Sequence, residues 1–584
     1  MLNNLKIKVI LIATLFLVFP PIVSADATLG EKVSFFVDSS FDADKRTQIG
    51  AQLQKITSKL YIYIDEAWWN SLTFDRKQEI NSTLSSLVEE FESKIYPTLT
   101  STFGSEPKPG IDGDEKITIL IHMMKKEAGG YFNSGNEYDK LQNPNSNERE
   151  MVYLNSDYIF NPILKSFLAH EFMHLINFNQ KDKMRGAEEE VWLNELRADY
   201  APTLLGYDSE YEGSNLQRRV NEFLKNPSDS LTDWQSAPAD YGALNLFSQY
   251  LVDHYGVKIL VDSLESSKKG IESINYALLK AGFKEDFSQI FTDWVITVLV
   301  NNCNIAPYRT EGSGAGLVTK YCYLNPNLKN LKLVPLSNFL PLNSDSVLSV
   351  NYLTKNWSAN WYKIFGGGGT LTFEFNGINN GNFKVPYLLC DSSGSCSVNF
   401  LNLNENQDEQ IIIKDFNTKY TSLTIIPSVQ NQNNISGNFS FSWSVKVNIQ
   451  NQEEELLINK LQFQLEALKT QIAWYQNKIN EILGKKSSSP ISTGSIPSGF
   501  TFKKNLSFGM SDSDVVYLKM ILDKEINHEK WSGNDYFGSK TLEAVKVFQK
   551  KYRAEISATA GYQISATGFA GTGTRVKLNQ LLGL

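Results

Sequence analysis

Cysteine is scarce in this sequence, and no stretch is dominated by charge of one sign. The 584 residues include four Cys, which are too few for a disulfide-dense scaffold and wrongly spaced for a zinc or iron–sulfur site with cysteine ligands. The 56 Lys and Arg residues are outnumbered by 64 Asp and Glu, and they form no basic block. Binding of nucleic acid through phosphate neutralisation is therefore not expected.

Long hydrophobic runs are also missing, apart from a short one near the N-terminus. That run, Val9–Phe19, follows two lysines and precedes Val23-Ser24-Ala25, and it is shorter than the ~20 apolar residues that span a bilayer. The pattern predicts a secretory signal over residues 1–25, cleaved after Ala25, with an uncleaved anchor as the alternative. No later run approaches spanning length, so we expect a secreted chain without a membrane span after signal removal.

The four cysteines fall into two close pairs, Cys303 with Cys322 and Cys390 with Cys396. Export permits disulfides, and four cysteines allow three connectivities. We expect the local pairing, and free buried thiols are the alternative.

Large apolar side chains are abundant, with 34 Phe, 26 Tyr and 10 Trp in a composition that is 42% hydrophobic. This composition excludes general disorder and is enough for several cores. At roughly 100–200 residues a domain, the length implies three or four domains.

Residues 26–300 combine strands with helices. Strands are expected at 33–37, 116–121 and 150–154, and helices around 53–69 and 78–95, before a mostly helical stretch from 161 to 300. The segment Asp112-Gly113-Asp114, just before the expected strand 116–121, offers too few oxygens for a full calcium loop and is expected to be a turn. The order of elements predicts an α+β domain with a mixed N-terminal lobe and a helical C-terminal lobe.

The rest of the chain is expected to form separate parts. A connector (301–345) leads to residues 346–450, where short strands separated by Gly and Asn turns indicate a β-sandwich. A Ser/Pro/Gly-rich stretch (485–499) is typical of a flexible linker. Residues 500–584 are expected to form a small helical C-terminal domain.

Residues 452–484 have the most regular periodicity in the sequence. Apolar residues recur at alternating spacings of three and four, at Ile458, Leu461, Leu465, Leu468, Ile472, Tyr475, Ile479 and Ile482. This pattern predicts a coiled-coil helix and makes 458–482 a candidate for self-association. An amphipathic helix packed on a neighbouring domain is the alternative.

The segment His170-Glu171-Phe172-Met173-His174 carries the main candidate chemistry. Apolar residues surround it on almost all sides of the expected helix, which is therefore expected to be buried. Residues four apart lie on one helix face, so His170 and His174 can offer two imidazoles to one tetrahedral ion. Glu171 is adjacent to them and can take a proton from a water at the metal.

A catalytic zinc site needs a third protein ligand and an open fourth position. Glu195, in the expected helix 192–199, is the natural third ligand, and Asp199 lies one turn further on the same face. Asp199 can hold the far nitrogen of a ligand imidazole. No third His follows within six residues of His174, which excludes an all-histidine site.

This helix pair resembles the gluzincin metallopeptidases, and the wider match is to the hyicolysin-like family over about residues 31–300. The match includes Ala128–Phe132, Asn147–Met151, Trp192–Glu195, Asp240–Gly242, Phe291 and Trp294. Leu196 and Arg197 stand where smaller residues are expected, which puts the packing of the ligand helix in question.

The resemblance implies a zincin-like catalytic domain and assigns the site residues. It implies Zn²⁺ as the cofactor, with His170, His174 and Glu195 as ligands and Glu171 as the general base.

Two further features are candidates for contact with substrate. Tyr241 is the first candidate for stabilising the oxyanion formed in peptide hydrolysis and His254 the second, with a structural role as the alternative for each. The segment Gly129-Gly130-Tyr131 is a candidate edge strand that pairs with substrate backbone, with a plain turn as the alternative.

The C-terminal segment resembles peptidoglycan-binding domains of the three-helix type over most of residues 502–583. The matching residues are Asp514, Val515, Leu518, Phe537, Gly538, Thr541, Ala544, Val545, Phe548, Gln549 and Tyr552, with an echo in Gly571, Thr574 and Leu578. The resemblance implies cell-wall binding, and general protein contact is the alternative. Two departures are Lys519, where Gln is usual, and a long connector over 553–567.

Taken together, these features predict a secreted, zinc-dependent metalloendopeptidase that acts on proteins or peptides and is held at the cell wall through residues 500–584. A second hypothesis is a peptidoglycan peptide hydrolase, delivered to its substrate by the same C-terminal domain. A third is a surface interaction protein that binds zinc without catalysis.

Overall fold

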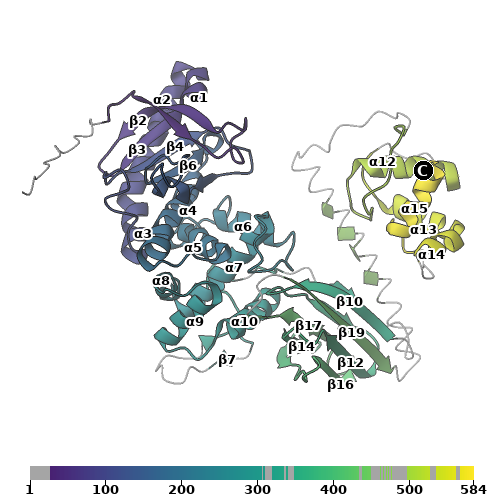
Figure 1. Ribbon diagram of the computed structural model, residues 1–584. Helices are drawn as coiled ribbons and strands as arrows, with labels where there is room; N and C mark the ends of the chain where they lie inside the picture. The colour runs from purple at the N-terminus through teal and green to yellow at the C-terminus, as the bar shows by residue number, and fades with distance from the viewer. Residues whose placement is uncertain are drawn as a thin grey trace, which may run out of the picture. The chain divides into compact units, whose positions relative to one another are not determined.

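The computed structural model describes residues 27–305, 307–308, 318–329, 331–333, 337–339, 347–432, 437–448, 496–526, 534–560 and 566–583, with a few residues between 461 and 476. The expected signal over 1–25, most of the helix expected over 452–484 and most of the linker expected over 485–499 lie outside this part. The chain divides into two compact units, Met1–Gln450 and Asn451–Leu584, both drawn in Figure 1.

The first unit begins with a six-stranded sheet in the order β1-β2-β3-β4-β6-β5. Its strands are β1 (Lys32–Phe36), β2 (Gln48–Ile56), β3 (Leu60–Asp65), β4 (Ile117–His122), β5 (Gly130–Phe132) and β6 (Met151–Asn155). β3, β4 and β6 are parallel, and β5 pairs antiparallel with β6 at the edge. Every residue of β4 and β6 is buried, which explains why these strands are mostly apolar without alternation. The three strands expected from the sequence are confirmed as β1, β4 and β6.

The prediction of a helix around 53–69 is wrong. That segment holds the end of β2, all of β3 and α1 (Glu66–Ser71). The Thr57 N–H donates to the Leu60 carbonyl (2.9 Å) and closes a tight turn between the strands. Successive side chains of β3 lie on opposite faces of the sheet and enter two different hydrophobic cores. Ile62 belongs to one core, and Tyr63 belongs to the other. Because both faces are buried, the strand shows no alternation of apolar and polar residues.

Helices pack on the sheet and extend beyond it (Figure 1). They are α2 (Phe74–Glu90), η1 (Phe91–Ile95), α3 (Tyr96–Phe103), η2 (Ser134–Glu137), η3 (Ser156–Tyr158), α4 (Leu164–Asn177), η4 (Phe178–Lys183), α5 (Val191–Leu204), α6 (Asn215–Phe223), α7 (Pro238–Tyr255), α8 (Lys258–Leu264), α9 (Gly270–Ala281) and α10 (Phe287–Val300). The helix expected around 78–95 is confirmed as α2 with η1. α4 lies between β5, β6 and α5, and all its residues except Lys165 and His170 are buried.

Within the described part of the chain, none of the helices combines the length and the hydrophobicity needed to cross a bilayer.

The strands beyond residue 336 form two larger sheets, β10-β19-β12-β16 and β15-β14-β17-β11-β9. The strands of these two sheets are β9 (Ser337–Phe339), β10 (Val347–Lys355), β11 (Tyr362–Phe365), β12 (Gly369–Gly377), β14 (Pro386–Cys390), β15 (Cys396–Phe400), β16 (Asp408–Phe416), β17 (Ser422–Ile425) and β19 (Asn438–Asn448). Two further pairs of short strands form separate two-stranded sheets: β7 (Pro307–Tyr308) with β8 (Val318–Thr319), and β13 (Phe383–Lys384) with β18 (Ser428–Val429). Phe373 and Trp443 from the first large sheet share a core with Ile425 from the second, so the two sheets face each other as a sandwich.

This sandwich packs directly on the helices that precede it. Trp357 is fully buried, and its ring lies 4.9 Å from that of Phe287 and 5.4 Å from that of Phe291, both on α10. The Trp361 Nε1–H donates to the carbonyl of Val295 (3.0 Å). One hydrophobic core therefore joins the two parts.

The disulfides have the expected local pairing, Cys303–Cys322 and Cys390–Cys396, with Cα separations of 5.0 and 4.1 Å. The first closes the segment that follows α10. The second joins the paired ends of β14 and β15.

The second unit contains a small helical bundle. Its helices are α12 (Ser513–Ile526), α13 (Ser539–Lys551), α14 (Arg553–Ala560) and α15 (Thr572–Leu581), and its own core includes Leu518, Phe548 and Leu578. α14 occupies the long connector noted in the sequence. Lys519 is buried, and its ammonium donates to the carbonyls of Asn534 and Tyr536 (3.0 and 2.7 Å).

Part of the apolar seam expected over 458–482 is described. Leu461, Leu465, Leu468, Ile472 and Tyr475 are each helical and expose between 42% and 59% of their surface. The remaining seam residues lie outside the described part, and the coiled coil stays a prediction.

Candidate metal centre

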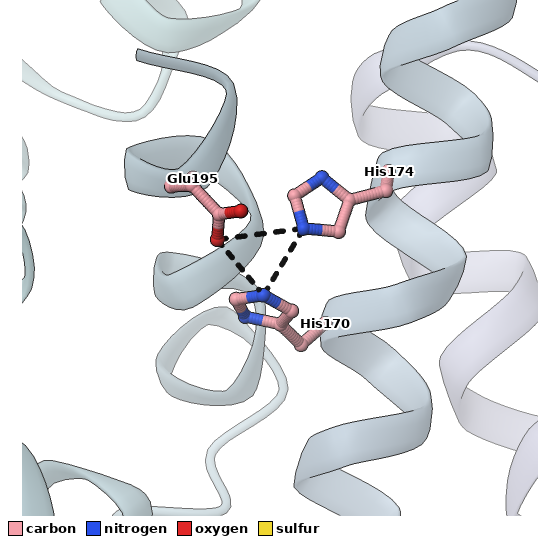
Figure 2. A group of neighbouring side chains, drawn as sticks. All are labelled: His170, His174 and Glu195. Carbon is pink, nitrogen blue, oxygen red and sulfur yellow. Dashed lines mark hydrogen bonds and ion pairs between the residues drawn. The ribbon is translucent and has the colours of Figure 1, made fainter. Parts of the chain in front are cut away.

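Two helices bring three potential metal ligands together (Figure 2). α4 carries His170 and His174 one turn apart, and α5 presents Glu195 opposite them. The Nε2 atoms of the two histidines are 3.1 Å apart. The Glu195 Oε2 atom lies 3.2 Å from His170 Nε2 and 3.5 Å from His174 Nε2.

This spacing fits a tetrahedral zinc ion. Bonds of ~2.0–2.1 Å from zinc to nitrogen and oxygen place the ligand atoms about 3.3 Å apart, and the three separations of 3.1, 3.2 and 3.5 Å lie around that value. The Glu195 Oε2 atom is also buried without a hydrogen bond from the described residues. A buried carboxylate oxygen in that state needs compensation by a cation, so the residues present fit zinc.

The neighbours of His174 fix its orientation. Its Nδ1 lies 3.1 Å from the Asn194 Oδ1 atom, which also accepts a hydrogen bond from Asn177 Nδ2 (2.6 Å). Because an amide oxygen only accepts, the His174 Nδ1 carries the proton and donates it. The Nε2 lone pair is thereby left facing the metal position.

His170 is supported by a charged network. Its Nδ1 lies 3.6 Å from the Asp199 Oδ1 atom. The Asp199 carboxylate accepts from Arg219 Nε and Nη2 (2.9 and 2.6 Å) and from Asn245 Nδ2 (2.9 Å). Asp199 and Asn245 are fully buried and Arg219 is nearly so, so the carboxylate is held at a fixed position behind the imidazole.

The site attracts positive charge. Burial alone lowers a histidine pKa, but Asp199 and Glu195 raise the pKa of His170 to about 10, and Glu195 raises that of His174 above its usual value. Burial likewise raises a carboxyl pKa, yet the two imidazoles hold the pKa of Glu195 well below its usual range. The negative charge of these buried carboxylates is what a divalent cation would neutralise.

Glu171 is adjacent to His170 and lines a cleft of about 560 Å³. Burial raises the pKa of its carboxyl, and the two neighbouring imidazoles partly oppose that rise. A Cβ atom placed on Gly130 would lie only 3.0 Å from Glu171 Cγ and 2.6 Å from the Tyr153 carbonyl. The glycine therefore lets the edge strand β5 approach both Glu171 and β6.

The structure brings most of the sequence-predicted site residues into this cleft. The cleft walls include Gly129, Gly130, His170, Glu171, Glu195, Arg218, Arg219, Trp234 and Tyr241. The ring centres of Tyr241 and His170 are 6.4 Å apart, and the Arg219 guanidinium lies 4.2 Å from the Tyr241 ring centre. No described strand pairs with the outer edge of β5, which leaves main-chain groups available there.

Two candidates lie elsewhere. His254 hydrogen bonds through Nε2 to the Cys322 carbonyl (2.8 Å), far along α7 from Tyr241. Tyr131 stacks on Tyr153 with ring centres 4.1 Å apart, and its side chain enters the core on the far face of the sheet. Tyr131 could meet a substrate only through its backbone.

Arg197, the departure noted in the ligand helix, points away from the metal position. It is fully buried, pairs with Glu189 (2.9 Å) and donates to Ser263 Oγ (2.9 Å). The larger residue therefore docks α5 onto α8 without disturbing Glu195.

Sequence reasoning named Asp199 as the support of a histidine but missed Asn194, Arg219 and Asn245. Asn194 directly precedes Glu195 in the Trp192–Glu195 motif, so its position could have been used to predict a role beside the metal site. Arg219 and Asn245 lie on α6 and α7, and their link to Asp199 depends on helix packing that no local pattern encodes.

The chain is similar to the neutral metalloprotease ShpI of Staphylococcus hyicus. The two sequences are 29% identical over 221 residues, which cover 33% of this chain and 48% of that protein. The chain therefore spans about half the length of the curated relative it matches. No family model matches the sequence.

Two solved structures show weak likeness to the chain. The M60 catalytic domain with CBM51 domains from Clostridium perfringens ZmpB covers 67% of this chain and 59% of its own length, at 9% identity and a TM-score of 0.22. The pre-peptidase C-terminal domain of Bacillus anthracis collagenase covers 19% of this chain and 95% of its own length, at 10% identity and a TM-score of 0.14. At these TM-scores neither likeness bears on the function.

Proposed function

We propose that this chain is a zinc-dependent metalloendopeptidase. The observation that carries the proposal is the convergence of His170, His174 and Glu195 at tetrahedral spacing, with His170 and Glu195 lining an open cleft. The similarity to a neutral metalloprotease supports the same activity. Glu171 would act as the general base, as the HExxH spacing predicts.

Each residue has a defined task in peptide hydrolysis. Zinc held by the three ligands would polarise the scissile carbonyl and make water more acidic. Glu171 accepts the proton of the attacking water and passes it to the leaving amine, and burial helps because it raises the pKa of this carboxyl above its usual value. Asp199 holds His170 and Asn194 holds His174, so the imidazoles stay aimed at the metal.

Two elements of the cleft would bind the substrate. The free edge of β5 can pair with an extended peptide and lay the scissile bond across Glu171. Tyr241 lines the opposite wall and is our candidate for donating a hydrogen bond to the oxyanion. His254 is not proposed for this role, because its ring nitrogen is already bonded to Cys322.

We further propose that the enzyme is secreted and held at the cell wall. The N-terminal pattern supports export, and the sequence of the second unit supports binding to peptidoglycan. A chain truncated after residue 450 should keep protease activity and lose co-sedimentation with purified sacculi. The isolated unit 500–584 should sediment, and its staying in the supernatant would refute wall binding.

The experiment that tests catalysis is Glu171→Gln in the mature full chain. Peptide cleavage should fall by at least about 1,000-fold, because removal of a general base costs that order, while one bound zinc remains. Glu272→Gln, at an exposed acid on α9, is the matched control and should retain full activity. Undiminished cleavage by Glu171→Gln would refute the mechanism.

The choice of substrate separates the second hypothesis from the first. Cleavage of casein favours a general endopeptidase, and release of peptides from sacculi without casein cleavage favours a wall hydrolase. Bound zinc without turnover on either substrate would favour a non-catalytic interaction protein.

A further inference from the structure

A second group of acidic side chains lies apart from the metal centre. Glu137, at the end of η2, and Glu150, just before β6, are 3% and 2% exposed. Neither carboxylate oxygen of Glu137 has a hydrogen-bond partner among the described residues, and the Oε2 atom of Glu150 has none either. Asp112, on the loop before β4, is close enough to act electrostatically on both glutamates.

Such a cluster is costly without a counter-charge. A buried carboxylate without hydrogen-bond donors loses its hydration and gains nothing in return. Burial and the neighbouring Glu150 raise the pKa of Glu137 to about 10, and burial also raises the pKa of Glu150. Lys183 and Arg149 are the nearby cations, and in the described part of the chain neither forms an ion pair with these glutamates.

The loop Gly110–Asp114 is packed against the pair. The Ile111 N–H donates to Glu150 Oε1 (2.8 Å). A Cβ atom on Gly110 would lie 1.5 Å from Glu150 Oε2, so only glycine allows this approach. These two contacts hold the backbone of the loop directly against the Glu150 carboxylate.

We propose that Glu137, Glu150 and the backbone of the loop Gly110–Asp114 form a structural binding site for a divalent cation, and that the cation is calcium. The donor set contains only oxygen, which suits a hard cation that takes six to eight oxygen ligands. The carboxylates alone do not supply six oxygen ligands, and in this proposal loop carbonyls and waters supply the remaining ones. The two glutamates supply the carboxylate oxygens, and Asp112 adds negative charge nearby.

Calcium at this position would connect three segments of the fold. It would tie the loop before β4 to η2 and to the start of β6. η2 follows β5 almost directly, and β5 forms the wall of the cleft beside Glu171. The ion would therefore stiffen the cleft without taking part in the reaction, and its binding does not depend on the proposed peptidase activity.

The test uses the full chain, stripped of metals and reloaded with one equivalent of zinc. Calcium binding is measured by calorimetry and by the unfolding temperature at pH 8, with magnesium for comparison. We expect one calcium site, a dissociation constant between about 10⁻⁶ and 10⁻³ M and an unfolding temperature that rises with calcium concentration.

Glu137→Gln should lose the calcium-dependent rise and bind calcium at least tenfold more weakly. In calcium-free buffer this variant should be no less stable than the parent, because an uncharged amide replaces a carboxyl group whose raised pKa favours its protonated form. The control is Glu148→Gln, at an acid two residues from Glu150 that is partly exposed and pairs with Lys140. This control should keep the calcium response.

Sharing of a proton between Glu137 and Glu150 is the competing account. Since the pKa of Glu137 is raised above 4.5 in the folded chain, cation-free protein should lose stability as pH rises between about 4.5 and about 10. Calcium should suppress that loss. An unfolding temperature indifferent to calcium throughout this range would overturn the proposal, as would unchanged binding by Glu137→Gln.

If the variant fails to fold, lanthanide anomalous density in crystals of the parent chain decides, and its absence between the two glutamates is a refutation.

Discussion

His170 and His174 owe their positions to helix geometry, but their alignment comes from residues far away in sequence. Their four-residue spacing places both rings on one face of α4. Asp199 and Asn194 then hold the outer nitrogens, and Arg219 with Asn245 holds Asp199. The histidines are therefore held by Asp199 and Asn194, and Asp199 in turn by Arg219 and Asn245. Changes in either set of supporting residues should alter the affinity for the metal.

Asp199→Asn should weaken zinc binding by about 10- to 100-fold, because it removes the charge that supports His170 while retaining the ligand set. Competition titration with a chromogenic chelator measures this change. Asn245→Ala removes one hydrogen bond to Asp199 but no charge, so its effect should be smaller. Parent-like affinity in Asp199→Asn would show that the 3.6 Å contact has no supporting role.

Tyr241→Phe should lower kcat by roughly 100-fold and change KM little, because an oxyanion donor acts mainly in the transition state. Steady-state kinetics on a peptide substrate separate the two constants. Tyr250→Phe is the control, since that hydroxyl lies on the same helix but donates to the Lys320 carbonyl. A rise in KM at constant kcat would instead assign Tyr241 to ground-state binding.

The three candidate ligands could be predicted from the sequence at this scale because their signals are local. The HExxH spacing indicated His170 and His174, and a short motif indicated Glu195. Arg219 offered no such signal, because its partner Asp199 is reached only when α6 packs beside α5. The buried Glu137–Glu150 pair was missed for the same reason, since it joins segments across the sheet.

Among the elements, β5 is the shortest strand of its sheet and lies against Glu171, the proposed general base. It contains only Gly130–Phe132, and its glycine permits contact with both Glu171 and Tyr153. Helix α4 was foreseeable from its continuous apolar sequence. β3 was not, because a strand buried on both faces lacks the alternation that distinguishes it from a helix.

Gly130→Ala should destabilise the fold by about 1–3 kcal/mol, because the added methyl group meets the Tyr153 carbonyl at 2.6 Å. Activity should fall further than stability, since the displaced strand borders Glu171. Urea unfolding and initial rates measure the two effects. Gly113→Ala would be a poor control because of its positive φ, whereas Ser134→Ala changes a nearby residue without such a clash. Normal activity in Gly130→Ala would show that β5 does not position the substrate.

At the scale of the whole molecule, the sandwich and the α+β part that holds the metal centre share one core in the first unit. The two parts have separate sequence patterns, with a predicted connector between them. These patterns do not reveal that Trp357 and Trp361 enter the helical core, because contacts across parts depend on how their surfaces fit. The sandwich is therefore expected to stabilise the α+β part as well as extend it.

Trp357→Ala should cost about 3–5 kcal/mol, the usual range for emptying a fully buried aromatic site. Loss of activity and loss of sandwich structure should occur in one denaturant transition. Phe400→Ala, at an exposed position on β15, should change stability by no more than about 0.5 kcal/mol. Two well-separated transitions, with activity surviving the first, would contradict a shared core.

X-ray absorption at the zinc edge, on the purified full chain and on Glu195→Ala, examines the metal centre most directly. The expected result is one zinc per chain with two imidazole nitrogens and a carboxylate oxygen at about 2.0–2.2 Å, and loss of the carboxylate contribution in the variant. An unchanged spectrum in Glu195→Ala, or a chain that retains no zinc, would contradict a centre built from His170, His174 and Glu195.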